Sequence, residues 1–167
     1  DSKLIAARVR DELVEPVKTW LIDGAVGYAS AAEIDSLGIT KCLALAAHRA
    51  FANFPEELKH ELLQHPATAL LDGSHNWLGD LGSIRVIVKT KADRDCVSVA
   101  AASVLAKVER DNLMIELAKT EPRFDWASNK GYSSPSHLLA LREIGPVAEH
   151  RKTWLTKILG ENTLFNF

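Results

Sequence analysis

The stretch from Ile84 to Asp111, IRVIVKTKADRDCVSVAAASVLAKVERD, decides the expected fold. It begins with Ile84 to Val88, a mainly β-branched run that is typical of a buried strand. A charged segment follows from Lys89 to Asp95, and the small apolar residues from Val97 to Val108 then predict a tightly packed helix. In α/β proteins with this order of strand, charged loop and helix, functional sites commonly lie at the end of the strand.

Length and composition are those of an ordinary globular domain. The chain has 167 residues, of which 47% are hydrophobic and 25% charged, so we expect one domain over residues 1–167 with a genuine core. No apolar run approaches the ~20 residues that span a bilayer. With a net charge of −2, nucleic-acid binding would require a local basic patch. Cys42 and Cys96 lack metal-type spacing and are expected to be reduced thiols of a cytoplasmic protein.

Hydrophobic periodicity and turn residues predict one α/β domain from the remaining segments. The expected helices are Leu4–Trp20 (bent by Pro16 or ended near Glu15), Ser30–Leu37 (opened by a Ser30/Glu33 capping box), Lys41–Ala52 (capped by Thr40), Glu56–Gln64, Val97–Lys119, Pro135–Ile144 and His150–Leu159. The expected strands are Ala25–Ala29, Ala67–Leu71 and Ile84–Val88, and a loop is expected over Phe124–Tyr132. The apolar tail from Leu164 to Phe167 is expected to pack against the domain.

Two carboxylates follow two of the expected strands. Asp72 closes the first and precedes Gly73, and Asp93 lies just past the end of the second. Carboxylates at the ends of adjacent strands would converge on one side of a sheet, where hard oxygen ligands suit Mg²⁺ or Mn²⁺. This pattern favours metal-assisted phosphoryl transfer. Taken alone, Asp72 is more simply the start of an Asp-Gly turn, and Asp93 belongs to an ordinary charged run.

A loop in the last third of the chain, Asn129-Lys130-Gly131-Tyr132, combines a cation, a flexible residue and an aromatic plane. Such a loop suits a phosphate and a stacked sugar or base, although a glycine turn with Tyr132 packed on the core explains it equally well. His137 is expected to be structural, and His75 neither a ligand nor a base. Six basic residues could together form a phosphate-binding face, although each one alone is better explained as a solvated surface residue. They are Lys89, Lys91, Lys107, Lys130, Arg151 and Lys152.

Several motifs together resemble one family. They are K-A-D at Lys91–Asp93 with V-S-V-A-A-A-S-V-L-A-K-V-E-R-D to Asp111, N-K-G-Y at Asn129–Tyr132, S-P-S-H-L-L-A-L-R-E-I-G-P to Pro146, E-H-R-K-T-W to Trp154, L-L-D-G at Leu70–Gly73, A-S-A-A-E-I-D at Ala29–Asp35 and D-S-K at Asp1–Lys3. In this order they resemble ribonuclease HII over nearly the whole chain. The most specific part runs from Lys91 to Pro146.

The resemblance implies an RNase H-like α/β fold, with a mixed central sheet flanked by helices and a helical C-terminal part. It implies an endonuclease that cuts the RNA strand of RNA–DNA hybrids and cuts 5′ of single ribonucleotides in duplex DNA. The products would carry 3′-hydroxyl and 5′-phosphate ends. The implied partners are these nucleic acids, with no membrane, and a monomer is expected.

The resemblance also assigns residues. Asp72 and Asp93 would be catalytic and would be two of the four acids that hold two divalent ions, Mg²⁺ or Mn²⁺. Tyr132 would stack on the deoxyribose that follows the ribonucleotide. Contacts with the substrate backbone would come from Lys3, Lys91, Lys130 and Gly131.

One departure from the family pattern concerns its first two acids, which lie in a D-E-x-G-R-G segment. No such segment occurs in these 167 residues, and we expect it to precede Asp1 in an active parent protein, with the 167 residues alone inactive. One alternative is a non-catalytic nucleic-acid-binding domain with the same fold. Another is ribonuclease HIII, against which the K-G-Y loop and the A-A-A-S-V-L-A-K helix favour ribonuclease HII.

Overall fold

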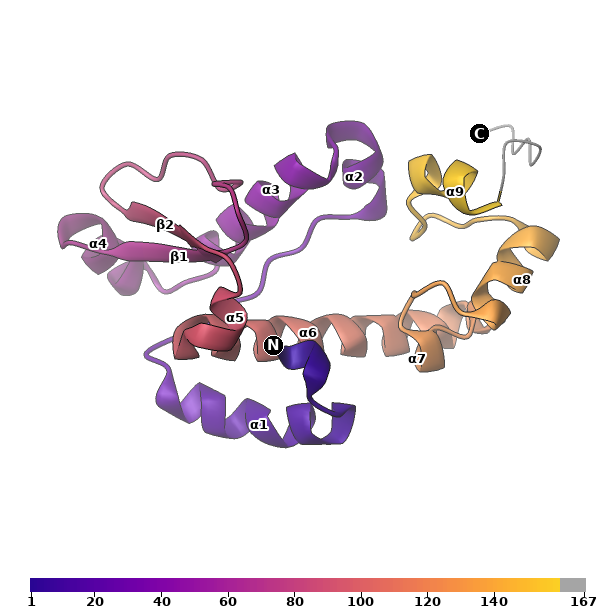
Figure 1. The fold of residues 1–167 in the computed structure, drawn as a ribbon, viewed down its shortest axis with the longest axis horizontal. Helices are drawn as coiled ribbons and strands as arrows, with labels where there is room; N and C mark the ends of the chain where they lie inside the picture. Colours follow the sequence, from indigo (N-terminus) through magenta and orange to yellow (C-terminus); the bar gives the residue numbers. More distant parts are fainter. Residues whose placement is uncertain (160–167) are drawn as a thin grey trace. The chain divides into compact units, whose positions relative to one another are not determined.

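The structure, a computed structural model, describes residues 1–159. The expected packing of the tail from Leu164 to Phe167 lies outside the described residues. The chain divides into two compact units, the first made of residues 1–28 and 40–109 and the second of residues 29–39 with those from Arg110 onward. This division falls within one helix, α6 (Val97–Thr120) (Figure 1). A single domain over residues 1–167 stays a prediction.

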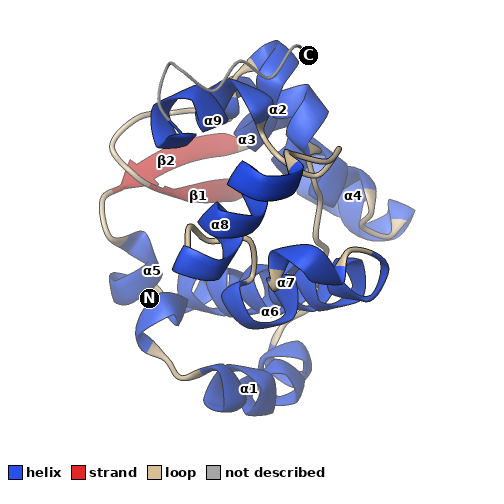
Figure 2. Cartoon of the chain, turned by 90° about the vertical axis from the view of Figure 1, so that its right-hand side faces the viewer, coloured by secondary structure: helices blue, strands red, loops and turns tan. Residues whose placement is uncertain are grey.

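The strand pair belongs to the first unit. β1 (Thr68–Asp72) and β2 (Arg85–Lys89) are parallel, with Asp72 opposite Lys89 in the register. Each strand is shifted by one residue from its predicted range. The predicted α/β class is confirmed, and the sheet formed within the described part of the chain is small and parallel beside its helices (Figure 2).

Most helices of the first unit follow the predicted pattern, although the helix predicted over Leu4–Trp20 begins later, at Ala7, and part of the predicted charged loop Lys89–Asp95 forms a short helix over Ala92–Asp95. They are η1 (Ser2–Leu4), α1 (Ala7–Trp20), α3 (Ile39–Ala52), α4 (Glu56–Gln64), α5 (Ala92–Asp95) and the first half of α6. The predicted end near Glu15 is wrong, because α1 continues through Pro16 to Trp20. Pro16 is exposed, so the carbonyl that loses its helical partner there remains open to water. The predicted cap at Thr40 is also wrong, because α3 already begins at Ile39.

The predicted strand over Ala25–Ala29 is wrong, since this segment pairs with no strand among residues 1–159. Two of its carbonyl groups are bonded instead by side chains near the C-terminal end of α3 and just after it. Asn53 donates to the carbonyl of Val26 (3.2 Å) and Arg49 to that of Tyr28 (2.7 Å). The segment therefore lies along a helix, and two of its carbonyl groups find donors without a sheet.

The second unit is helical. It contains α2 (Ala31–Leu37), the second half of α6, η2 (Pro122–Phe124), α7 (Trp126–Asn129), α8 (Pro135–Ile144) and α9 (Lys152–Leu159). Its core is formed by Phe124, Trp126, Ala140, Leu141 and Leu155. The predicted Ser30/Glu33 capping box and the predicted start of α8 after Ser134 are confirmed. The predicted loop over Phe124–Tyr132 is wrong, because burial of Phe124 and Trp126 folds part of it into η2 and α7.

Asp35 of α2 caps the distant helix α9. Its carboxylate accepts hydrogen bonds from the backbone N–H groups of Lys152 (2.7 Å) and Thr153 (3.1 Å) and from the Thr153 hydroxyl (2.5 Å). The first N–H groups of a helix have no partner within it, so this contact satisfies two of them. None of the helices within residues 1–159 is long and apolar enough to cross a membrane.

The first prediction concerns this cap. Burial alone would raise the pKa of Asp35, but the hydrogen bonds from Thr153 and Lys152 outweigh it and hold the pKa below its ordinary value. The cap should therefore stabilise the fold above the unfolded pKa of about 3.9 and lose this effect as the pH falls through the lower folded pKa. Asp35→Ala should cost about 1 kcal/mol in the free energy of unfolding at pH 7.

Chemical denaturation at pH 7 and at pH 3 measures this effect. Asp35→Asn is the matched control, because asparagine keeps an acceptor oxygen at the helix start and loses only part of the stabilisation. Equal stability of Asp35→Ala and the wild type at pH 7 would contradict the role of Asp35 as a cap.

Candidate active site

The C-terminal end of β1 is joined to the start of α5 by a hydrogen bond. The carboxylate Oδ1 of Asp72 accepts from the backbone N–H of Ala92 (2.9 Å). Ala92 is fully buried and immediately precedes Asp93, which lies in the first turn of α5. The structure therefore brings the residues that carry the two predicted carboxylates to the same edge of the strand pair. Asp72 is exposed, and Asp93 is half-buried.

The backbone between β2 and α5 is held in an uncommon conformation. Lys91 precedes α5 with φ 60° and ψ 32°, in the left-handed region, which costs about 1–2 kcal/mol for a residue with a Cβ atom. The Thr90 hydroxyl donates to the carbonyl of Gly73 (3.3 Å), the residue after Asp72. Lys91, which lies between Asp72 and Asp93 in the sequence, has an exposed side chain in this turn.

One cation at this edge is already paired. Lys89, opposite Asp72 in the register, forms an ion pair with Asp95 of α5 (2.9 Å). The hydrogen bond and charge of Asp95 raise the pKa of Lys89, and those of Lys89 lower the pKa of Asp95. Lys89 is therefore a structural partner of α5. Arg94 and Lys91 also lower the pKa of Asp95, so positive charge surrounds this short helix.

The first residues of the chain contact the same helix. The backbone nitrogen of Asp1 donates to the carbonyl of Asp93 (2.8 Å), and the carboxylate of Asp1 caps η1 through the N–H of Lys3 (3.0 Å). Buried Arg10 ties this segment to α1 by donating to the carbonyl of Ser2 (3.1 Å). These contacts place the exposed Lys3 on a segment that is anchored beside Asp93.

The donor set fits a hard divalent cation. Among the described residues, no group of three or more His, Cys, Asp or Glu side chains is arranged to hold a metal ion. Asp72 and Asp93 offer carboxylate oxygens, and Mg²⁺ is usually bound by one or two carboxylates, with water and substrate phosphate at its other positions. The pair therefore suits Mg²⁺ or Mn²⁺ held partly by a phosphate ligand.

The N-K-G-Y loop in the second unit is a tight, internally bonded turn. The Asn129 side chain donates to the carbonyl of Phe124 (2.7 Å) and accepts from the N–H of Gly131 (2.8 Å). Lys130 is left-handed (φ 52°), and its ammonium donates to the carbonyl of Ala127 within α7. Gly131 has φ 77°, a left-handed conformation that favours glycine, and a Cβ atom there would also lie 3.1 Å from Met114 Cε.

Tyr132 presents its ring at the surface. Its side chain is 56% exposed, and the Arg110 guanidinium lies over the ring, 5.4 Å from its centre. Arg110 also donates to the carbonyl of Lys130. Tyr132 lines a cavity of about 330 Å³, whose wall also contains Arg151, stacked over Trp154 at 4.6 Å. An exposed ring beside arginine is suited to stacking on a sugar or base.

The predicted site residues thus fall into two groups. The first unit holds Asp72, Asp93, Lys91 and Lys3, and the second unit holds Lys130, Gly131 and Tyr132. His75 is exposed in the loop after β1. Sequence interpretation missed Arg110 and Asn129, which hold the N-K-G-Y loop. The sequence gives little indication of their roles, because each is an ordinary polar residue whose contacts form only in the folded loop.

The family whose model is described as "Ribonuclease HII" matches residues 1–157. The chain belongs to the ribonuclease HII family. The ribonuclease HII of Streptomyces coelicolor is 44% identical over 154 residues, which cover 92% of this chain and 62% of that protein. That of a Thermus thermophilus strain is 39% identical over 155 residues, or 91% of this chain and 69% of that protein. The chain thus spans less than two thirds of the length of the Streptomyces ribonuclease HII.

The crystal structure of ribonuclease H2 from Pyrococcus horikoshii OT3 supports the fold of this ribonuclease HII family member. The two structures superpose with a TM-score of 0.67 over 95% of this chain and 78% of that chain, at 21% sequence identity. At this level of identity the likeness concerns the fold alone. It is consistent with the RNase H-like fold that the sequence motifs imply.

Proposed function

We propose that this chain carries the catalytic region of an endoribonuclease that cuts the RNA strand of RNA–DNA hybrids and cuts 5′ of a single ribonucleotide in duplex DNA. The observation that carries the proposal is the hydrogen bond from Ala92 to Asp72 (2.9 Å). It joins the ends of the two segments that bear Asp72 and Asp93, in a chain of the ribonuclease HII family. A role in ribonucleotide removal during DNA repair and replication would follow from this specificity.

In the proposed reaction, Asp72 and Asp93 hold divalent ions at the scissile phosphate. Such ions, Mg²⁺ or Mn²⁺, would supply a charged clamp on the attacking and leaving oxygens of an in-line displacement. The Ala92 N–H restrains one oxygen of Asp72 and so orients its carboxylate. Lys91 and Lys3 are exposed cations on anchored backbone, suited to contact phosphates on either side of the cut.

In the second unit, the proposed role of the N-K-G-Y loop is to read the junction between ribonucleotide and DNA. Tyr132 would stack on the deoxyribose after the ribonucleotide, and the turn at Gly131 lets backbone approach the strand closely. Lys130 would contact the substrate backbone, for which its ammonium must leave the Ala127 carbonyl. We propose that the protein acts as a monomer on these nucleic acids.

The test is cleavage of a DNA duplex that contains one ribonucleotide, in Mg²⁺ or Mn²⁺, by this chain and by the full product of its gene. An RNA–DNA hybrid and an all-DNA duplex of the same sequence are run in parallel. We expect the full gene product to make one cut 5′ of the ribonucleotide, leaving 3′-hydroxyl and 5′-phosphate ends, and neither protein to cut the all-DNA duplex. Binding without cutting by both proteins would instead favour a non-catalytic nucleic-acid-binding domain.

The second prediction concerns Tyr132. Tyr132→Ala should lower the preference for the single-ribonucleotide duplex over the uniform hybrid by roughly tenfold, because it removes a stacking contact worth about 1–3 kcal/mol. Tyr132→Phe is the matched control, because it keeps the ring and should retain most of the preference. Cleavage rates on the two substrates give the ratio. If the ratio of the two cleavage rates is unchanged in Tyr132→Ala, Tyr132 does not recognise the junction.

A further inference from the structure

Two histidines in the second unit lie buried against each other behind the N-K-G-Y loop. His137 of α8 and His150, which precedes α9, are 5% and 7% exposed. Their Nε2 atoms are 3.0 Å apart, and aromatic rings of Phe124 and Trp126 pack around them. Two buried nitrogens at this distance require one donor and one acceptor.

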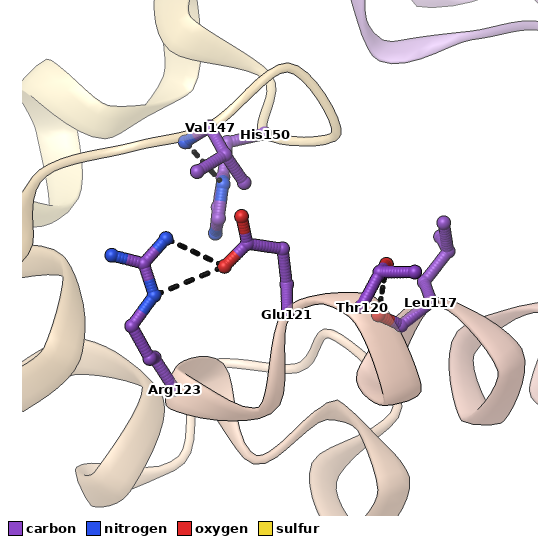
Figure 3. A network of polar contacts seen from close by, with 6 residues as sticks. All are labelled: Leu117, Thr120, Glu121, Arg123, Val147 and His150. Carbon is purple, nitrogen blue, oxygen red and sulfur yellow. Dashed lines mark hydrogen bonds and ion pairs between the residues drawn. The ribbon is translucent and has the colours of Figure 1, made fainter.

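The outer partner of His150 determines which nitrogen carries its proton. The backbone N–H of Val147, which can only donate, points at His150 Nδ1 (3.1 Å) (Figure 3). His150 Nδ1 must therefore be unprotonated, so the neutral ring carries its proton on Nε2. That proton is donated to Nε2 of His137.

A second donor gives the same direction. The indole N–H of Trp126 points at Nε2 of His137 (3.4 Å), and an indole nitrogen only donates. His137 Nε2 is therefore an acceptor, and its proton lies on Nδ1. There it is donated to the carbonyl of Tyr132 (2.9 Å). The chain of hydrogen bonds runs from Val147 through His150 and His137 to Tyr132.

We propose that His137 and His150 are positioning residues, a neutral pair whose one-way hydrogen bonds fix the Tyr132 backbone and so aim its ring at the nucleic-acid substrate. The proposal deepens the proposed function and rests on it for the role of the ring. The Tyr132 carbonyl also accepts from the N–H of Ser134 (2.8 Å), and its own N–H donates to the carbonyl of Asn129 (2.9 Å). His137 supplies the side-chain contact that ties this turn to the core.

This series of hydrogen bonds, from Val147 to Tyr132, requires that both histidine rings are neutral. A proton added to His150 Nδ1 would oppose the Val147 N–H, and a proton added to His137 Nε2 would oppose its two donors. Burial of His150, and then the repulsion that His137 exerts when it is charged, lower the pKa of His150 to about 4. The charged groups near the pair are Glu121, which lies beside the His150 ring and is held by Arg123 (2.6 Å) (Figure 3), and Arg110, Glu149 and Arg151 of the adjoining cavity.

The direct test is nitrogen NMR of the histidine rings in the wild-type chain at pH 7. The expected result is a proton on Nε2 of His150 and on Nδ1 of His137. The Tyr132 resonances should move as His150 takes up its proton near pH 4. A proton on Nε2 of His137, or a His150 that is charged at pH 6, would overturn the proposal.

Variants test the link to Tyr132 and to the substrate. His137→Asn places an amide donor where Nδ1 stood, whereas His137→Leu removes the donor. Affinity for the single-ribonucleotide duplex should fall about tenfold in His137→Leu, as in Tyr132→Ala, and should be largely restored in His137→Asn. Affinity for the all-DNA duplex should be equal in both. An equal loss on all duplexes would indicate a merely structural role and overturn the proposal.

His150→Gln provides a second route if His137→Leu does not fold, because its amide keeps a donor facing His137. Junction affinity should then stay within about threefold of the wild type, and a loss as large as that of Tyr132→Ala would overturn the proposal. The two hypotheses fail separately. If the histidine protons are found as expected but the protein neither binds nor cuts the duplexes, the proposed function is wrong. If the protein cuts the duplexes but the histidines have other tautomers, the proposed role of the histidine pair is wrong.

Discussion

Asp93→Asn in the full gene product is expected to reduce cleavage of the single-ribonucleotide duplex by at least about a hundredfold while leaving the melting temperature unchanged. An amide oxygen lacks the charge that a divalent ion requires, and such an ion supplies several kcal/mol of transition-state stabilisation, where about 1.4 kcal/mol is a factor of ten in rate. The fold should persist, because the contact that Asp93 makes with Asp1 uses its backbone carbonyl (2.8 Å). Single-turnover cleavage in saturating Mg²⁺ measures the effect.

Asp95→Asn is the matched control for Asp93→Asn. It makes the same chemical change two residues further along α5, where the carboxylate pairs with Lys89 (2.9 Å) at the surface. We expect this variant to cleave within about threefold of the wild type, since exposed ion pairs contribute little. If Asp93→Asn kept the wild-type rate, or if both variants lost the same amount, Asp93 would not be a metal ligand.

Gly27→Ala is expected to cost about 2–3 kcal/mol in the free energy of unfolding, which corresponds to a loss of roughly 5–10 °C in melting temperature. An added Cβ atom would lie 2.0 Å from the carbonyl oxygen of Ala46 and 2.5 Å from the backbone nitrogen of Ala50. Both atoms belong to the backbone of α3, which cannot yield as a side chain can. The segment around Gly27 would have to leave the helix.

Gly24→Ala controls for the change of glycine to alanine in the same segment. There the new Cβ atom would meet only the ends of the Leu21 and Leu105 side chains, at 3.1 and 3.3 Å, and these can rotate. We expect a change of less than about 1 kcal/mol. Thermal and chemical denaturation of the two variants measure the contrast. Equal stability of both would show that the segment does not lie against α3 as described.

Local signals in the sequence were sufficient for much of the fold. The strands at Thr68–Asp72 and Arg85–Lys89, the helix Glu56–Gln64 and the helix after Ser134 follow from apolar period, capping residues and proline position. In each case the deciding residues are neighbours along the chain. Similar local logic placed Asp72 and Asp93 at strand ends, and their roles as ligands stay predictions.

Contacts between distant residues explain what the sequence alone could not show. The segment Ala25–Ala29, after a turn signal, was predicted to be a strand, yet two of its carbonyl groups are bonded by Asn53 and Arg49. The cap of α9 by Asp35 joins residues 117 positions apart. His137 was expected to be structural, but its partner His150 and the direction of their hydrogen bonds depend on how α8 and the following turn pack.

The two lysines in left-handed backbone, Lys91 and Lys130, have a consequence for engineering. Glycine or asparagine would hold these turns at lower energy than lysine. A selection for heat resistance alone should therefore enrich Lys91→Gly and Lys130→Gly, and a selection for nuclease activity should restore lysine. The residues found at these two positions after selection would then show whether stability or nuclease activity was favoured.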